Sequence, residues 1–321
     1  MLCLLPLVFI RGGGRIAVSQ TAVVDFLSVG QGDCSVIRTK NGSTYLIDCG
    51  STSVRSVGEY RLKPWLKYHG ISQLEAVFLS HPDSDHTNGV LELLEKTNEP
   101  DDWYRGEIQI KNLVLPAAYR EEDGFVAMYE LAVDRNIPVF WFDTGDTVAE
   151  EDIIFTCLHP IETYSVYDTN DASMVLMVEC ADTIVFFPGD IGGGGEEQVI
   201  GAVQDRVSQK QVFDKEIGHQ GQQQTVYAEN KMNGEGQVIL KVAHHGSRNS
   251  TSEAFLNVLQ PDIAVISCGK DNSFGHPHEE TLERVQKAGC DIVSTPELGT
   301  VTVWIGRTGT TVTGYKSGVH R

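Results

Sequence analysis

The feature that most constrains the fold is a series of short, β-branched apolar runs that recur along the chain from residue 21 onward. Runs such as TAVVDFLSV, AVFLS and IAVIS have the length and composition of buried strands, and Asn41-Gly42 is a typical turn between two strands of a hairpin. Only a few stretches with helical spacing lie between these runs, for example residues 125–136. Many strands with few helices predict an α+β fold of packed layers rather than a doubly wound sheet.

Composition divides the chain into a leader, a domain and an insertion. Residues 1–20 start with MLCLLPLVFI, which at about ten residues is shorter than the ~20 that a membrane-spanning helix needs. Because this run lacks a basic start and a small-residue cleavage site, we expect a poorly ordered leader rather than a signal peptide. We expect residues 21–321 to form one domain with an insertion at about 193–236, a segment rich in Gln, Glu and Gly whose first third has helical character.

The strongest chemical signal is the segment His81-Pro-Asp83-Ser-Asp85-His86, which follows the apolar run AVFLS. Two imidazoles and two carboxylates within six residues match the donor set of a divalent metal. The alternative is an Asp-rich turn in which Asp85 or Thr87 caps the next helix. That alternative explains neither histidine, so we predict a metal-binding loop between a strand and a helix.

Later apolar runs end in the same residue types. Gly189-Asp190 follows VFFP, His244-His245 follows LKVA, and His276 and His278 lie between IAVIS and the next helical stretch. Each is ambiguous alone, because Gly-Asp turns are common and His278 would also suit the start of a helix. A turn explains the weaker segment Thr169–Ser173 equally well. Together, however, ligands from separate strand ends are what a layered scaffold brings into one cleft.

In this order, the segments resemble the metallo-β-lactamase fold and, more narrowly, the metallo-hydrolase domain of ComEC competence proteins. The similar segments, which span roughly residues 22–306, are VDFLSVGQGDCSVIRTKNGSTYLIDCG, FLSHPDSDHTNGV, TNDASMVLMVEC, FFPGDI, LKVAHHGSRNSTSEAFLNVLQPDIAVISCG and SFGHPHEETLERVQKAG. The resemblance implies a four-layer αββα sandwich that holds two divalent metal ions in the cleft between its sheets.

The resemblance also implies a role for each matching residue. The expected metal ligands are His81, Asp83, Asp85, His86, Asp190 and His245, with His244 as the alternative to His245. The residues expected to brace the metal loop are Asp33 and Asp48. The residues expected to contact substrate are Asn170, Ser173, His244, Ser247 and His278, with Lys241 and Arg248 near enough to meet phosphate. Two catalytic roles are expected: Asp85 orients the attacking water, and His276 or the unligated histidine of the His244/His245 pair protonates the leaving oxygen.

Two residues depart from the pattern of the wider superfamily. Asp83 stands where the loop usually has a second histidine, and Asn170 stands where another histidine ligand is usual. Both departures are normal for the ComEC-like branch. Carboxylate-rich ligation shifts preference from zinc toward manganese or magnesium. We therefore expect two divalent ions, zinc or manganese, with magnesium as a third option.

The function that this resemblance implies is metal-dependent hydrolysis of a phosphodiester, foremost of nucleic acid. The net charge of −19 argues against extended contacts with a polyanion, because few cations are available to neutralise phosphates. A small phosphoester is therefore an alternative substrate, and a β-lactam or other acyl substrate is a third that Asp83 disfavours. A non-catalytic binding module that uses the insertion is the alternative from another class, and the intact ligand set argues against it.

The seven cysteines are scattered and form no CxxC pair, so we predict small buried thiols rather than disulfides. Free thiols and the lack of a clear signal peptide favour the cytoplasm and leave a secreted or periplasmic location open. No membrane span is expected, and the oligomeric state has no signal in the sequence.

Overall fold

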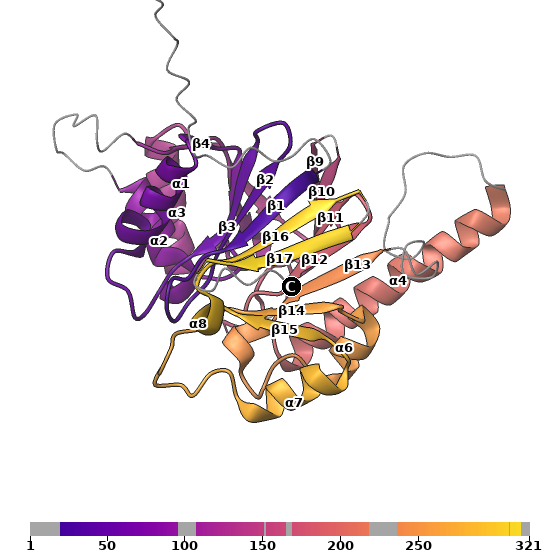
Figure 1. Cartoon of the computed structure of the whole chain (residues 1–321). Coiled ribbons are helices and arrows are strands. Elements are labelled where there is room, and N and C mark those ends of the chain that lie inside the picture. The colour runs from indigo at the N-terminus through magenta and orange to yellow at the C-terminus, as the bar shows by residue number, and fades with distance from the viewer. Residues whose placement is uncertain are drawn as a thin grey trace, which may run out of the picture.

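The computed structural model describes residues 20–95, 107–150, 152–164, 169–217, 236–307 and 309–315. The predicted leader, apart from Gln20, and the end of the predicted insertion lie outside these residues. Within them, two large β-sheets pack face to face, and helices cover the outer side of each sheet (Figure 1).

The first sheet has eight strands in the described residues, in the spatial order β17-β16-β1-β2-β3-β5-β7-β8. These strands are β1 (Gln20–Phe26), β2 (Cys34–Thr39), β3 (Thr44–Cys49), β5 (Ala76–Phe78), β7 (Leu113–Pro116), β8 (Val139–Phe142), β16 (Val301–Gly306) and β17 (Gly309–Gly314). The predicted hairpin is confirmed, because β2 and β3 are antiparallel neighbours. From β3 to β8 the strands run parallel. The short strands β4 (Gln73–Leu74) and β6 (Gln109–Ile110) pair separately.

The second sheet has seven strands in the described residues, in the order β15-β14-β13-β12-β11-β10-β9. They are β9 (Thr147–Glu150), β10 (Ile153–His159), β11 (Val175–Cys180), β12 (Thr183–Phe187), β13 (Gln237–Lys241), β14 (Ile263–Ile266) and β15 (Asp291–Ser294). Strands β12 to β15 run parallel, whereas β9 to β12 are antiparallel. Both sheets are therefore mixed.

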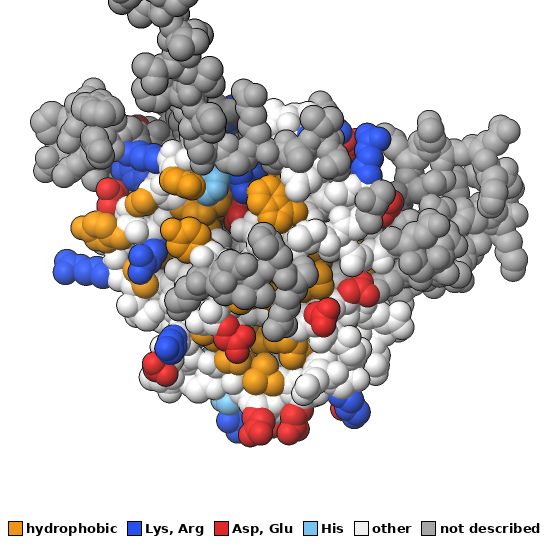
Figure 2. Space-filling model, viewed as in Figure 1, with side chains coloured by type: hydrophobic (Ala, Val, Ile, Leu, Met, Phe, Trp, Pro, Cys, Tyr) orange, Lys and Arg blue, Asp and Glu red, His pale blue; other side chains and the backbone are white. Residues whose placement is uncertain are grey.

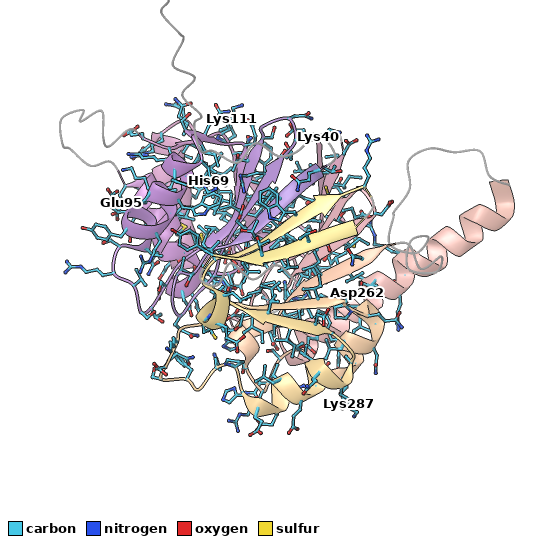
Figure 3. The ribbon with its side chains drawn as sticks, viewed as in Figure 1. Lys40, His69, Glu95, Lys111, Asp262 and Lys287 are labelled. Atoms are coloured by element: carbon cyan, nitrogen blue, oxygen red, sulfur yellow. The ribbon has the colours of Figure 1, made fainter. Side chains whose placement is uncertain are left out.

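The helices form two outer layers on opposite sides of the sheets (Figure 1). The layer on the first sheet contains α1 (Lys63–Tyr68), α2 (Ser84–Leu94) and α3 (Asp123–Asp134); the layer on the second contains α4 (Gly193–Ile217), α6 (Glu253–Leu259) and α7 (Glu279–Lys287). The short α8 (Thr295–Leu298) leads into β16. On the outer surface, Lys287 of α7 pairs with Glu253 of α6 at 2.8 Å (Figure 3).

Three apolar cores hold these four layers together. The central core lies between the sheets, where the rings of Phe78 and Phe155 stack at 5.0 Å. A second core joins the first sheet to its helices, and a third joins the second sheet to its helices. This arrangement confirms the expected α+β sandwich with the layer order αββα.

Parallel strands bring the chemically interesting loops to one edge of each sheet. Strands β3 and β5 point the same way in the first sheet, and β12, β13 and β14 do so in the second. Because the carboxyl ends of parallel strands meet at one edge, the loops after these strands lie side by side. The start of β2 lies at the same edge as the end of β3, because Cys34 pairs with Cys49 across the antiparallel hairpin.

Helix α2 begins three residues earlier than the spacing of its apolar residues indicates. It starts at Ser84, so Asp85 and His86 lie in its first turn rather than in a loop. Asp83 occupies the N-cap position, but its side chain makes no capping hydrogen bond. The capping interpretation of this segment is therefore wrong, and the carboxylates are left available for another role.

The segment predicted as an insertion begins as part of the packed fold. Helix α4 begins at Gly193, the first residue of this segment, and its Val199 and Val203 are buried against the second sheet. Glu196 of the same helix accepts a hydrogen bond from the backbone N–H of Ser252. No described helix has both the length and the apolar character that crossing a bilayer requires. The described cysteines are buried thiols, as expected: Cys34, Cys49, Cys157, Cys180, Cys268 and Cys290.

Candidate metal centre

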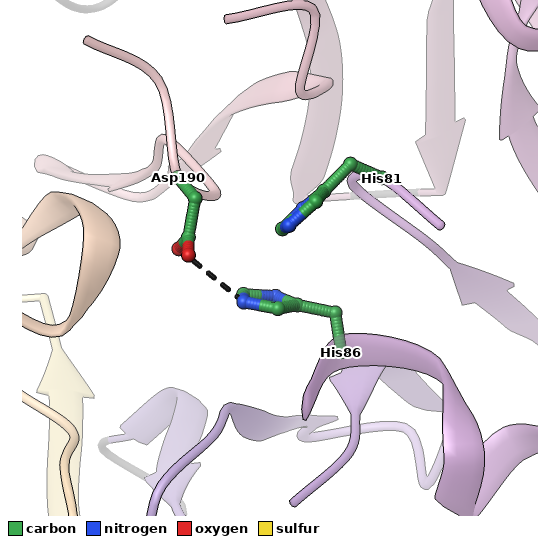
Figure 4. Close-up of side chains that lie close together, drawn as sticks. All are labelled: His81, His86 and Asp190. Atoms are coloured by element: carbon green, nitrogen blue, oxygen red, sulfur yellow. Dashed lines mark ion pairs between the residues drawn. The ribbon is translucent and has the colours of Figure 1, made fainter. Parts of the chain in front are cut away.

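Three buried side chains from distant parts of the sequence meet at the edge where the loops converge (Figure 4). His81 follows β5, His86 lies in the first turn of α2, and Asp190 follows β12. Nε2 of His86 is 3.3 Å from Oδ1 of Asp190, and the two imidazole rings are 4.1 Å apart. One ligand atom from each residue lies within 4.8 Å of the others, so a single cation could contact all three.

A second group of donors lies beside the first. Nε2 of His245, in the turn after β13, is 3.4 Å from Oδ2 of Asp85 and 3.6 Å from Oδ2 of Asp190. Ligand atoms of Asp85, His86 and His245 also lie within 4.8 Å of one another. Asp190 therefore belongs to the first group and also faces His245 of the second, which suits a carboxylate shared by both groups. These five residues, His81, Asp85, His86, Asp190 and His245, are called the metal centre below.

Buried donor atoms in the metal centre lack hydrogen-bond partners within the described residues. They are Nε2 of His81, His86 and His245 and Oδ1 of Asp190. A buried polar atom without a partner costs about 1–3 kcal/mol, so native proteins rarely leave several in one place. Imidazole nitrogens and carboxylate oxygens are the ligands of zinc and manganese. The residues present therefore fit divalent cations.

Asp48 and Ser80 orient two of the imidazoles from behind. Asp48 accepts hydrogen bonds from N and Oγ of Ser80, both at 2.7 Å, and from Nδ1 of His86 at 2.9 Å. Because the Ser80 hydroxyl donates to Asp48, its oxygen is left to accept from Nδ1 of His81 at 3.0 Å. Each ring is thereby fixed with Nε2 facing the metal centre, which is how ligating histidines are usually held. Asp48 thus lies behind the metal loop, where the bracing role is predicted, and Ser80, which the prediction did not include, directly precedes His81.

A strained turn decides which histidine of the adjacent pair enters the metal centre. His244, His245 and Gly246 all have positive φ values, of 49°, 54° and 89°, which non-glycine residues adopt only under constraint. His245 is buried and donates from Nδ1 to the carbonyl of Ser267 at 3.0 Å. The His244 ring is partly exposed, with Nε2 3.7 Å from Oδ2 of Asp190. The geometry thus favours His245 as the ligand and leaves His244 beside it.

A buried ion pair lies on the protein side of the metal centre. Lys241 pairs with Asp33, whose Oδ1 is 3.4 Å from Nδ1 of His245 and whose Oδ2 is 3.8 Å from Nδ1 of His86. Burial alone would raise the pKa of Asp33, but Lys241 and His245 hold it below its usual range. Asp33 therefore lies beside both histidines, and its bracing role stays a prediction. Lys241 does not have the position expected of a phosphate contact, because its side chain is only 3% exposed.

The charges of the metal centre depend strongly on one another. Burial would raise the pKa of Asp190, but His86 and His245 hold it well below its usual range. Burial would lower the pKa of both these histidines, but Asp190 outweighs it, raising the pKa of His245 to about 9 and that of His86 well above its usual value. Burial and then His86 lower the pKa of His81 to about 3, so this imidazole is neutral. A cation entering the metal centre must therefore displace protons from His86 and His245.

Other predicted residues lie around this centre. Asp83 is at its rim, with its side chain 45% exposed and Oδ2 3.8 Å from Nε2 of His81. Ser173 is fully buried; its hydroxyl donates to the carbonyl of Asn170 at 2.7 Å and accepts from the backbone N–H of Asp190 at 3.2 Å. Ser173 therefore shapes the Asp190 loop, and direct contact with substrate is not supported.

The loop after His245 holds the remaining predicted contacts. Ser247 is buried, which again does not support direct substrate contact. His278 precedes α7 and accepts at Nδ1 from the backbone N–H of Arg248 at 3.1 Å, so it fixes that loop. The Arg248 side chain is exposed and pairs with Glu280 at 3.3 Å.

His276 lies beside the metal centre rather than within it. Its ring is 5.6 Å from the ring of His244 and 6.3 Å from that of His245. Burial and then the neighbouring His245 lower the pKa of His276 to about 4. Nε2 of Gln31 lies 3.5 Å from its Nδ1, a contact that the sequence analysis missed.

Comparison with solved structures supports the same architecture. The metallo-beta-lactamase fold protein YhfI from Bacillus subtilis superposes with a TM-score of 0.50 at 9% sequence identity, covering 86% of this chain and 96% of that one. At this identity the likeness shows the fold alone.

Curated relatives share more of the sequence. ComE operon protein 3 of Bacillus subtilis (strain 168) is 29% identical over 297 residues, which are 88% of this chain and 33% of that protein. Recombination protein 2 of Haemophilus influenzae is 28% identical over 281 residues, which are 87% of this chain and 28% of that protein. The chain thus spans about a third of the length of these relatives. These matches confirm the resemblance inferred from the sequence motifs.

A family model matches the part of the chain that carries the metal centre. The Metallo-beta-lactamase superfamily model covers residues 27–270, from the end of β1 to the loop after β14. The matched range includes every residue of the metal centre and both bracing carboxylates. The fold, the convergence of strand-end ligands and this match agree, and the chain belongs to the metallo-β-lactamase superfamily.

Proposed function

We propose that this protein is a metal-dependent phosphodiesterase that hydrolyses nucleic acid at a dinuclear metal centre. The observation that carries the proposal is the pair of adjacent donor groups that share His86 and contain buried ligand atoms with no hydrogen-bond partner among the described residues. Members of the superfamily are generally hydrolytic, which supports hydrolysis as the reaction class.

The ligands divide between two ions. Asp85, His86 and His245 would hold one ion, and His81 with the rim residue Asp83 would hold the other. Asp190, which lies close to both histidines of the first set and to His81, would contribute to both ions. Because half of these ligands are carboxylates, manganese, zinc and magnesium are all chemically suitable.

The reaction needs an activated water and a stabilised phosphoryl group. When bound, two divalent cations supply Lewis acidity and lower the pKa of a nearby water toward neutrality. Asp85 is partly exposed, so its carboxylate accepts a hydrogen bond from the water and orients it toward phosphorus. Asp48 and Ser80 keep the imidazoles in place during the reaction, because their hydrogen bonds fix Nδ1 of each ring.

The leaving oxygen needs a proton, and two histidines are placed to donate it. An imidazole gives up such a proton as the imidazolium, so His276, whose ring lies beside that of His245, must first be protonated. Its pKa of about 4 is that of the protein without substrate, and the negative charge of a phosphodiester would raise it. His244 is the second donor, because its ring is partly exposed and lies against both Asp190 and His276.

Two observations bear on the substrate class. A relative named Recombination protein 2 supports nucleic acid. The net charge of −19 argues against binding of long tracts of nucleic acid. On the face shown in Figure 2, the described Lys and Arg side chains are scattered among acidic ones and form no continuous basic stripe. The charge favours a small phosphoester as the second candidate substrate.

The test is a substrate panel measured with each metal. Single-stranded DNA, double-stranded DNA, RNA, bis-p-nitrophenyl phosphate and nitrocefin are each incubated with manganese, zinc or magnesium. We expect metal-dependent cleavage of the phosphodiesters and a loss on the order of 10²-fold or more in Asp85→Asn. Asp152→Asn is the matched control, because Asp152 is an exposed carboxylate paired with Lys40. Cleavage of nitrocefin alone, or full phosphodiesterase activity in Asp85→Asn, would refute the assignment.

A further inference from the structure

The loop between β14 and α7 exposes a large aromatic side chain beside the metal centre. Phe274 is 55% exposed, although phenylalanine is normally buried. An exposed apolar residue far from any site needs no explanation. Phe274 differs because it lies two residues before His276, which borders the metal centre.

The exposure of Phe274 is imposed by an ordered loop. Oδ1 of Asn272 accepts from the backbone N–H groups of Phe274 at 3.1 Å and His276 at 3.0 Å. Nδ2 of the same side chain donates to the carbonyl of Gly269 at 2.9 Å. Gln31, from the loop before β2, accepts at Oε1 from the N–H of Gly269 at 3.1 Å. The loop is therefore tied to itself and to the first sheet, and it holds the ring in solvent.

The ring of Phe274 continues a series of rings that leads to the ligands. It stacks on His276 at 5.7 Å with an interplanar angle of 24°. The His276 ring in turn contacts those of His244 at 5.6 Å and His245 at 6.3 Å. Phe274 is thus separated from a proposed metal ligand by one imidazole.

The chemistry of such a ring suits a nucleobase. Every base has a π-face, and stacking on an aromatic side chain contributes about 1–3 kcal/mol per base in single-stranded complexes. This contribution needs no positive charge on the protein. An acidic chain that must bind a polyanion gains more from stacking than from phosphate contacts, which its net charge of −19 opposes.

We propose that Phe274 and His276 form a stacking platform for a nucleobase next to the phosphodiester being cleaved. The inference rests on the proposed function and makes it more specific, because the preferred substrate is then a single-stranded, base-bearing phosphodiester. Phe274 selects the substrate through its π-face, and the metal centre performs the hydrolysis.

The test compares two oligomers that differ only in their bases. One is a single-stranded oligothymidylate, and the other has the same length and abasic sugars throughout; both are assayed for KM with the manganese-loaded protein. The variants are Phe274→Ala, Phe274→Leu, which keeps apolar bulk without a π-face, and Phe274→Trp. Phe140→Ala is the matched control, because Phe140 is 49% exposed on the edge strand β8.

We expect the wild type to have a KM for the abasic oligomer about 5-fold to 150-fold higher than for oligothymidylate, which corresponds to about 1–3 kcal/mol. This preference falls toward unity in Phe274→Ala and Phe274→Leu and persists in Phe274→Trp and Phe140→Ala. Equal KM values in the wild type, or a preference that survives in Phe274→Leu, would overturn the platform and leave the hydrolase intact.

A wild type that cleaves neither oligomer nor bis-p-nitrophenyl phosphate would overturn the proposed function instead. Fluorescence anisotropy of the labelled oligomers then decides the platform separately. Binding that requires bases in the wild type and loses this requirement in Phe274→Leu supports the platform, and equal binding of both oligomers by the wild type refutes it.

Discussion

Two buried ionic clusters involve the first sheet, and they differ in how their polar atoms are satisfied. In the Asp25 cluster, Arg38 donates to one oxygen of Asp25 from Nη2 at 2.8 Å and from Nε at 3.1 Å, and Thr302 donates to the other at 2.7 Å. In the metal centre, three imidazole nitrogens and an oxygen of Asp190 are buried and have no hydrogen-bond partner in the part of the chain that the structure describes. Protein groups satisfy the first cluster, whereas the second presents donor atoms that fit a divalent cation.

This contrast predicts that the two clusters respond oppositely to mutation. Damage to the Asp25 cluster should reduce stability and leave metal content unchanged. Damage to the metal centre should remove metal and activity. Each prediction below tests one side of that contrast.

The largest effect is expected from Asp190→Asn. The amide lacks the charge to serve two ions, so metal content should fall from about two ions per chain to one or fewer, and phosphodiesterase activity should fall on the order of 10³-fold. Elemental analysis and initial rates measure both quantities. Asp25→Asn is the control and should keep its metal. If the Asp190→Asn protein kept two ions and undiminished rates, the metal centre would not differ from the Asp25 cluster in its need for metal.

The next effect is expected from Arg38→Ala. This change leaves Asp25 buried without its cation, which typically costs about 3–5 kcal/mol in the free energy of unfolding. Urea unfolding measures the loss, and elemental analysis of the folded protein should still find about two ions per chain. If Arg38→Ala is too unstable to purify, Arg38→Lys provides the milder variant. Loss of metal with unchanged stability would contradict the assignment of a purely structural role.

Lys241→Met is expected to lower the stability of the metal-free protein and to increase the stabilisation that a bound metal provides. Without Lys241, the buried Asp33 loses its lysine partner and keeps only His245 and His86, so the free energy of unfolding of the metal-free protein should fall by about 3 kcal/mol. A bound cation is attracted by the uncompensated Asp33, so the increase in melting temperature on adding manganese should exceed that of the wild type. Thermal unfolding with and without chelator measures this difference. An unchanged or smaller increase would show that Lys241 does not act on the metal centre through charge.

The smallest effect is expected from Ser80→Ala. Removing a group that orients a ligating histidine typically costs 10- to 100-fold in metal affinity, and we expect a loss of about 10-fold here because Asp48 still holds His86. Competition with a fluorescent chelator measures the affinity. Ser43→Ala is matched to it, because the Ser43 hydroxyl also bonds a carboxylate, Glu150. Equal affinities in the two variants would contradict the orienting role.

Much of the fold and of the metal centre could be predicted because the informative residues follow apolar strands. His81, Asp190 and His245 each come three or four residues after the end of such a strand, and parallel strands bring those ends to one edge. The metal loop was recognisable because two histidines and two carboxylates in six residues have no common structural explanation.

The features that could not be predicted depend on contacts between residues far apart in the sequence, which local sequence patterns do not indicate. Ser267 orients the His245 ring with its backbone carbonyl, so the identity of the Ser267 side chain does not indicate this contact in the sequence. Lys241 lies in an apolar strand and looked available for phosphate, but its partner Asp33 is more than 200 residues away in the sequence. Likewise, the first turn of α2 contains Ser84, Asp85 and His86, so the spacing of apolar residues gives no signal for it.

The position of Asp190 between the two donor groups has a consequence for how the molecule is assembled. His81 and His86 belong to the half of the chain that builds most of the first sheet, and Asp190 and His245 belong to the half that builds the second. An ion held by residues of both halves would join the two sheets, so its affinity would depend on how the halves pack against each other.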